Sequence, residues 1–195
     1  MSSVHQSSSP TTSVPTSSQT HPFVQFQRYL SPYILRRGYE LWQNNDGWLV
    51  ANFFSNWNGV ACDYDKDKPF PISINLPFNK LEGTIIWEIS QFQLLGEINL
   101  NDIRFYGTIP PQLGSLSSLQ TLRIDVNDLV NMSVGQAIPV EVANTKLLGY
   151  LESPIHDNNL TGTVPQVVCV GVDIIVADYP GEVACSCCRV CYTAP

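Results

Sequence analysis

Cysteine is the most reactive residue type in this chain of 195 residues, and four of its six cysteines gather near the C-terminus. Their thiolates could bind zinc, or they could oxidise to disulfides that staple the end of the chain. The adjacency of Cys187 and Cys188 departs from the usual zinc pattern, in which roughly two to four residues separate paired ligands. The spacing therefore favours disulfides over a metal site, with the pairing left open, for Cys185, Cys187, Cys188 and Cys191.

Histidine offers little for acid–base catalysis. Two of the three histidines lie in the first 22 residues, and the third, His156, stands beside Asp157. A catalytic base needs a third group that fixes it and a pocket that holds the substrate, whereas a lone His–Asp pair is typical of a solvated surface. The sequence also lacks a phosphate-binding glycine loop. We therefore expect a protein that is not an enzyme, with no cofactor and no metal.

Two tripeptides match the acceptor sequence for N-linked glycosylation, Asn131-Met132-Ser133 and Asn159-Leu160-Thr161. Sugars are attached at such sites in the secretory pathway, so both are candidates only if the chain is exported. Asn159 follows a repeated asparagine, where close packing is an obstacle to the transferase.

The composition limits the partners. The net charge is −7 and only 14% of the residues are charged, which disfavours binding to nucleic acids or to anionic membranes. No apolar run is long enough to cross a bilayer, and no signal peptide is visible. The cysteine cluster nevertheless favours an extracellular or cell-surface location. A gene model that lacks an upstream signal or anchor would reconcile these observations, with membrane contact only through that anchor.

Two segments precede the repeats. Residues 1–22 are rich in Ser, Thr, Gln and Pro, which predicts a disordered tail or stalk. Residues 23–70 are expected to cap the N-terminal end of the domain. A helix is predicted within residues 24–43, because Ser31 can cap its N-terminus and Pro32 fits the first helical position. Its apolar face would cover the open edge of the first repeat.

A repeat over residues 71–168 decides the fold class. Gly83 and Gly107 are 24 residues apart, and Gly107 and Gly162 are 55 apart, which is two periods and about seven more. An irregular insertion is therefore expected near residues 131–147. About four repeats are predicted, and the pattern is clearest in Leu76-x-x-Asn79-x-Leu81-x-Gly83-x-Ile85, Leu100-x-x-Ile103-x-Phe105-x-Gly107-x-Ile109-Pro110 and Ile155-x-x-Asn158-x-Leu160-Thr161-Gly162-x-Val164-Pro165.

Each repeat is expected to form one coil of a solenoid, with a short strand, a turn and a return segment. Alternation along a strand places every second side chain on the inner side, where stacked coils share a continuous apolar core. The inward residues expected from this alternation are Ile72, Ile74 and Leu76, then Ile98 and Leu100, then Leu122 and Ile124.

A buried polar ladder is expected at the turns. Asn79, Asn127 and Asn158 recur at one position of the repeat, and Ile103 interrupts them. An amide side chain at this position can pair with backbone groups of neighbouring coils. The repeated Gly permits unusual backbone angles, and the Ile-Pro pair that follows sets an extended return path.

The combination L-x-x-N-x-L-x-G-x-I-P resembles the plant-type leucine-rich repeat. Upstream, residues 57–63 (WNGVACD) resemble the N-terminal cap of that class. Downstream, residues 177–191 are similar to the Cys-rich C-terminal cap of leucine-rich repeat proteins from diatoms. The resemblance covers about residues 30–191. It implies a right-handed, mostly β, α/β repeat solenoid with a helical N-terminal cap and a C-terminal cap over residues 169–195.

The resemblance also implies an extracellular recognition domain, often part of a membrane-tethered receptor-like protein. Two departures remove implied cysteine partners. Ser55 stands where the N-terminal cap has the partner of Cys62, and Tyr179 stands where the C-terminal cap has the partner of Cys169. The coils stacked between Cys62 and Cys169 would hold them beyond the roughly 7 Å that a disulfide allows. A lost disulfide costs about 2–5 kcal/mol, so a less stable or degenerate copy is expected.

The strands of such arrays line a concave face whose outward side chains are free to meet a partner. The face expected here is polar and slightly acidic, which suits a peptide, glycan or protein with basic or hydrogen-bonding groups. The alternative is that these positions are simply solvated. The expected outward residues are Ser73 and Asn75, then Glu97, Asn99 and Asn101, then Arg123 and Asp125, with His156 in the fourth repeat.

Two classes of function follow from the sequence. The first is an extracellular module for protein or ligand recognition, as the ectodomain or a fragment of a receptor-like protein. The alternative is a structural or surface solenoid of the cell-wall, ice-binding or inhibitor type, without a signalling role. That alternative requires a flat Thr-rich ladder or an apolar patch, and the sequence offers Thr84, Thr108 and Thr163 in equivalent positions.

Overall fold

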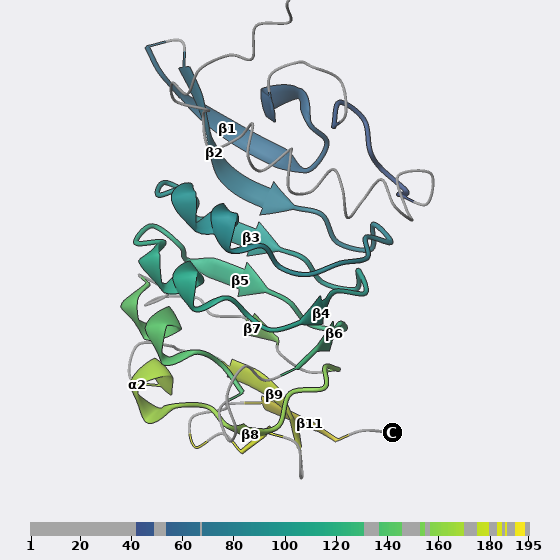
Figure 1. The fold of residues 1–195 in the computed structure, drawn as a ribbon, viewed down its shortest axis with the longest axis vertical. Coiled ribbons are helices and arrows are strands. Elements are labelled where there is room, and N and C mark those ends of the chain that lie inside the picture. The colour runs from purple at the N-terminus through teal and green to yellow at the C-terminus, as the bar shows by residue number, and fades with distance from the viewer. Residues whose placement is uncertain are drawn as a thin grey trace, which may run out of the picture.

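The protein forms a stack of short coils along one axis (Figure 1). The computed structural model describes residues 42–48, 54–66, 68–130, 137–145, 153–154, 157–169, 175–179, 183–184, 186 and 190–193. The predicted tail and nearly all of the predicted N-terminal helix lie outside these residues. In the described part of the chain, no helix is long and apolar enough to span a bilayer.

One four-stranded sheet runs along the stack. Its order is β1 (Val60–Asp65), β2 (Lys68–Asn75), β3 (Glu97–Asn99) and β5 (Thr121–Arg123). β1 and β2 form an antiparallel pair, whereas β2, β3 and β5 are parallel. Ile74 pairs with Ile98, and Ile98 pairs with Leu122, so each 24-residue step in sequence is one step across the sheet. The predicted stacking of the repeats is confirmed.

The core is a set of apolar rows behind this sheet. Ile74 and Ile98 are each 1% exposed and Leu122 is 4% exposed. Two residues further on, the backbone pairing continues, because the Leu76 N–H donates to the Asn99 carbonyl at 2.9 Å and the Leu100 N–H donates to the Arg123 carbonyl at 2.8 Å. Burial of aliphatic side chains contributes about 25 cal/mol per Å² of apolar surface, so these rows are the main source of stability. The next row is also buried and consists of Leu76, Leu100 and Ile124.

The prediction that Ile72 points inward is wrong, since its side chain is 39% exposed. The pairing of β1 with β2 shifts between Ala61 and Cys62, because Ala61 faces Ser73 while Cys62 faces Pro71. Ile72 is therefore the extra residue of a β-bulge, and the inside–outside alternation changes across it. Pro71 takes the buried position instead.

The return segments are short 3₁₀ helices on the side of the stack opposite β4 and β6 (Figure 1). They are η3 (Trp87–Gln91), η4 (Pro111–Ser115) and η5 (Val140–Asn144), and a short α-helix, α2 (Gln166–Cys169), lies on the same side near the end of the stack. Another 3₁₀ helix, η2 (Phe54–Asn56), precedes β1. The sequence predicted only an extended path after each Ile-Pro. η5 lies within the range predicted as an irregular insertion. A Cβ on Gly114 would come within 2.1 Å of the Glu141 carbonyl oxygen, so the close packing of η4 against η5 requires glycine.

A second row of very short parallel strands forms the flank of the stack. β4 (Tyr106–Gly107) pairs with β6 (Asp128–Leu129), and β8 (Gly162–Thr163) pairs with β10 (Val183–Ala184). Isolated bridges between Gly83 and Phe105 and between Val130 and Asn159 extend this row. A separate three-stranded sheet has the order β11 (Val190–Thr193), β9 (Ile175–Tyr179) and β7 (Ser153–Pro154).

Candidate functional site

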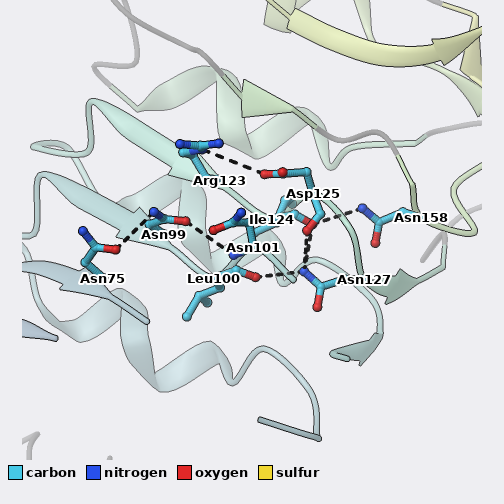
Figure 2. A network of polar contacts seen from close by, with 9 residues as sticks. All are labelled: Asn75, Asn99, Leu100, Asn101, Arg123, Ile124, Asp125, Asn127 and Asn158. Carbon is cyan, nitrogen blue, oxygen red and sulfur yellow. Dashed lines mark hydrogen bonds and ion pairs between the residues drawn. The ribbon is translucent and has the colours of Figure 1, made fainter. Parts of the chain in front are cut away.

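The strand face of β2, β3 and β5 carries polar residues in aligned columns. The register places Ser73 beside Glu97, and Asn75 beside Asn99. The Ser73 hydroxyl donates to Glu97 Oε2 at 2.8 Å. Asn99 Nδ2 donates to Asn75 Oδ1 at 3.1 Å, as Figure 2 shows. Side chains that are 24 residues apart in sequence thus bond to each other across adjacent strands.

The predicted face residues differ in their access to solvent. Asn75 is exposed, and Ser73, Glu97 and Arg123 are half-buried. The other three are buried, which corrects the expectation that all seven are free to meet a partner. Neighbouring side chains of a short-spaced parallel sheet crowd each other, and here they also bond to the backbone, as Asn99 Oδ1 does in accepting from the Asn101 N–H at 3.4 Å. The exposed fractions are 8% for Asn99, 6% for Asn101 and 4% for Asp125.

Arg123 provides the positive charge of this face. Its Nε lies 3.9 Å from Asp125 Oδ1, and the side chain of Arg123 is 38% exposed whereas that of Asp125 is 6% exposed. A pair at this separation with one member in solvent is weak. The contact with Asp125 therefore leaves the guanidinium available to a ligand. Figure 2 shows Arg123 above Asn99 and Asn101 in the view.

The repeated asparagines hold the turns below this face. Asn127 Oδ1 accepts from the Phe105 N–H at 2.8 Å, and its Nδ2 donates to the Leu100 carbonyl of the preceding coil at 2.8 Å. Nδ2 also lies at 3.1 Å from the Ile124 carbonyl and at 3.0 Å from the Asp125 carbonyl. Asn158 repeats the arrangement, with the Leu129 N–H and the Ile124 carbonyl as its partners.

Asn79 makes similar hydrogen bonds to the backbone of the segment that precedes the repeats. Its Oδ1 accepts from the Asn44 N–H at 2.8 Å, and its Nδ2 donates to the Asn44 carbonyl at 3.0 Å. Beside it, the rings of Trp48 and Trp57 stack with centroids 4.5 Å apart, and Trp42 meets Trp48 edge-on at 5.3 Å. All three rings are buried, and Asn79 bonds to the segment that carries Trp42 and Trp48.

Some features of the face were not predicted. Thr121 lies beside Glu97 in the register and is half-buried, and the alternation that found Arg123 would also have found it. The residues before the ladder positions have positive φ, with values of 56° at Phe78, 53° at Asp102 and 54° at Val126. A β-branched residue in this conformation is strained. Asp102 and Asp157 are of a type that is enriched in this conformation, whereas Phe78 and Val126 are not.

Cys62 is the cysteine whose side chain lies among the residues that the structure describes. Cys62 is a free thiol, as expected from the serine at position 55, and burial raises its pKa above the ordinary value. Its neutral thiol is a weak nucleophile at neutral pH. The side chains of the C-terminal cysteines, His156 and Asn131 lie outside the described residues. Among those described, no group of three or more His, Cys, Asp or Glu could hold a metal ion.

No family model matches this sequence, but curated relatives do. The LRR receptor-like serine/threonine-protein kinase EFR of Arabidopsis thaliana is 38% identical over 73 residues, which are 37% of this chain and 7% of that protein. The probable LRR receptor-like serine/threonine-protein kinase At1g51880 of the same organism is 31% identical over 100 residues, which are 51% of this chain and 12% of that protein. The chain thus spans a small part of these relatives, within their leucine-rich repeats.

Solved structures share the architecture. A crystal structure of PEPR1-AtPEP1 matches 71% of this chain and 18% of that chain, with a TM-score of 0.58 at 26% identity. The LRR ectodomain of the receptor kinase SOBIR1 from Arabidopsis thaliana matches 88% of this chain and 96% of that chain, with a TM-score of 0.57 at 15% identity. A plant ice-binding protein matches 82% of this chain and 56% of that chain, with a TM-score of 0.51 at 18% identity. The likeness to the last two shows the fold alone, which is a leucine-rich repeat solenoid.

Proposed function

We propose that this plant-type leucine-rich repeat protein is an extracellular recognition module that holds a protein or peptide ligand against the strand face of β2, β3 and β5. The observation that carries the proposal is the ordered polar surface of that face. The Ser73 hydroxyl holds the Glu97 carboxylate at 2.8 Å, and Asn99 Nδ2 holds the Asn75 side chain at 3.1 Å. Groups that are already fixed lose little conformational freedom when a ligand binds, which favours recognition.

The charges of the face define the ligand that would fit. Glu97 on β3 and Arg123 on β5 are both half-buried, and Asn75 on β2 is exposed. A segment that offers a basic group to Glu97 and an acceptor to Arg123 would satisfy both. The exposed Asn75 offers an amide group to an extended backbone. A peptide or the loop of a protein meets these requirements, whereas nucleic acids would face a chain of net charge −7.

The proposed organisation follows the receptor-like relatives. In it, residues 1–22 form a stalk, residues 23–70 an N-terminal cap, residues 71–168 about four repeats and residues 169–195 a C-terminal cap stapled by disulfides. The chain would be an ectodomain, or a fragment of one, at the cell surface. The matches to receptor-like kinases support this location, because they fall in the leucine-rich repeats of those proteins.

Panning a displayed random-peptide library on the full chain would test the proposal. We expect the enriched peptides to lose at least about tenfold in affinity when Arg123→Glu or Glu97→Lys reverses a charge on the face. The matched controls are Arg104→Glu and Glu82→Lys, which reverse exposed charges away from the strand face. Peptides that respond to the controls and not to the face variants would contradict the proposed site. Circular dichroism of each variant would show that it is folded.

A surface-binding solenoid of the ice-binding type is the second candidate. The threonines at equivalent positions on the flank favour it, since Thr84 and Thr108 are half-buried and Thr163 is exposed. Glu82 and Tyr106 interrupt the same flank with a charge and an aromatic ring. Microscopy of ice crystals grown with the full chain would test this candidate. Crystal shaping that is lost in Thr108→Glu would support it, and crystals identical to those in buffer would exclude it.

A further inference from the structure

We infer that Asn159 carries an N-linked oligosaccharide and that this glycan covers an exposed apolar strip on the flank of the solenoid. The inference rests on the export that the proposed function requires. Asn159 is the first residue of the tripeptide Asn159-Leu160-Thr161, which is an acceptor sequence for this modification.

Two adjacent asparagines have opposite environments at this point. Asn158 is 7% exposed, and its amide is occupied, because Oδ1 accepts from the Leu129 N–H at 3.1 Å and Nδ2 donates to the Ile124 carbonyl at 3.0 Å. Asn159 is exposed. The turn that buries the ladder residue therefore presents the next residue to solvent. Close packing of the ladder is thus no obstacle to a glycan on Asn159.

The backbone conformation suits the acceptor sequence. Asn159 bridges to Val130 in parallel, and β8 begins at Gly162, so the tripeptide enters an extended flank strand. Alternation in an extended segment puts Asn159 and Thr161 on one side and Leu160 on the other. The burial follows this pattern, since Leu160 is 1% exposed while Asn159 and Thr161 are exposed. A sugar on Asn159 projects into solvent while Leu160 keeps its place in the core.

The modification is a group transfer from a lipid-linked oligosaccharide diphosphate. A bond forms between Asn159 Nδ2 and the anomeric carbon of the sugar. The bond between that carbon and the phosphate oxygen breaks, so the lipid diphosphate leaves. The amide nitrogen gives up one proton in the same step. The product is a neutral amide, so the side chain remains compatible with the solvent-exposed position that Asn159 occupies.

Exposed apolar side chains lie near Asn159, and a glycan on this residue would cover them. Val130, its bridge partner, is 41% exposed, and Tyr106 on the adjacent coil is 45% exposed. The coils are fixed side by side, because the Val130 N–H donates to the Gly107 carbonyl at 2.7 Å. Exposed apolar residues on the edge of short strands invite association between chains. A hydrated glycan that starts beside Val130 would cover this strip.

Cell-free translation with microsomes tests the site directly on the full chain behind a cleavable secretion signal. Only the protease-protected product is scored. In the Asn131→Gln background, we expect a size shift that N-glycosidase removes, that Thr161→Ser retains and that Thr161→Ala loses. Asn131→Gln controls for the other acceptor sequence and should leave the Asn159 modification in place. A protected Asn131→Gln product with no size shift would overturn the inference.

The covering role has its own test on secreted protein. We expect Asn159→Gln to aggregate faster than the glycosylated chain, and Val130→Thr in the same background to restore the original rate. Equal aggregation of the glycosylated and Asn159→Gln proteins would refute the covering role. The peptide-binding experiment uses unglycosylated protein made in bacteria, so its failure would overturn the proposed function and leave the modification result unaffected.

Discussion

The second and third coils place different residues at the same turn, Ile103 in one and Asn127 in the other. Asn127 joins four backbone groups with one side chain, including the Phe105 N–H and the Leu100 carbonyl of the preceding coil. Ile103 is fully buried and can form none of these hydrogen bonds. One coil therefore satisfies its turn with polar contacts, and the other fills the same space with apolar atoms.

The difference has a cost in the first coil. By the 24-residue step, the partners that an asparagine at position 103 would serve are the Leu81 N–H and the Leu76 carbonyl. No described group pairs with either of them. A buried backbone group without a partner costs about 1–3 kcal/mol. The strand pairing and the apolar rows continue through the second coil regardless, so the ladder tolerates the loss of one asparagine.

The largest effect is expected from removing the third-coil asparagine. Asn127→Leu keeps the size of the side chain but leaves the Phe105 N–H and three carbonyl groups without that partner. We expect the free energy of unfolding to fall by about 3–5 kcal/mol, measured by urea denaturation. Asn58→Ala removes an exposed asparagine side chain and should change it by less than about 0.5 kcal/mol. A small effect of Asn127→Leu would show that the two coils do not differ in the way described.

A smaller effect is expected at Asn79, which bonds to the Asn44 backbone and not to another coil. Asn79→Ala should lower the free energy of unfolding by about 1–2 kcal/mol. The change should appear in tryptophan fluorescence, because the stacked Trp48 and Trp57 rings lie in the segment that Asn79 holds. If the unfolding transition followed by tryptophan fluorescence is the same in Asn79→Ala as in the wild type, Asn79 does not stabilise the segment that carries these rings.

A substitution in the turn of the third coil should raise the stability of the protein. Val126 has a φ of 54° in the third coil, and Asp102 has a φ of 53° at the same position of the second coil. Asparagine and aspartate tolerate this conformation better than β-branched residues. Val126→Asn should therefore raise the free energy of unfolding by about 1 kcal/mol, whereas Asp102→Asn should leave it nearly unchanged. Equal responses at the two positions would contradict the assignment of strain to Val126.

The smallest effect is expected from restoring the ladder with Ile103→Asn. The amide would lose the apolar burial of Ile103 but would reach the Leu81 N–H and the Leu76 carbonyl. We expect these terms to offset each other to within about 1 kcal/mol. The matched control is Ile98→Asn, which buries an amide in the apolar row and should cost about 3 kcal/mol. Urea denaturation would give the free energy of unfolding of Ile103→Asn and of Ile98→Asn. If both variants lose a similar amount of stability, the amide at position 103 finds no hydrogen-bond partners.

The repeat and its core could be predicted because the 24-residue period and the alternation along each strand are visible in the spacing of the apolar residues. Ile74, Ile98 and Leu122 pair as their spacing requires. The error at Ile72 arose because a β-bulge changes the alternation, and the proline at position 71, a residue type found at bulges, was not used as its signal. η4 and η5 begin directly after or at a proline and η3 begins after Ile86, but the sequence predicted only an extended path at these positions.

The candidate face could be predicted in position but not in accessibility. Alternation gives the side of the sheet on which a residue lies, and it placed Asn75 and Arg123 correctly on the outer side. It contains no information on crowding between neighbouring coils, which buries Asn99, Asn101 and Asp125. That crowding depends on the close spacing of parallel strands and on which neighbours bond to each other.

The long step between the last two asparagines of the ladder has a consequence for how this protein can change. Phe105 and Asn127, 22 residues apart, make the same contact as Leu129 and Asn158, which are 29 residues apart. The segment between Leu129 and Asn158 is thus longer than its counterpart in the preceding coil, and the additional residues leave the hydrogen bond between the two coils intact. Foreign sequence could be inserted between Leu129 and Asn158, and lineages could lengthen or shorten the chain there, provided that the buried residues Ala137, Ile138 and Val142 are kept.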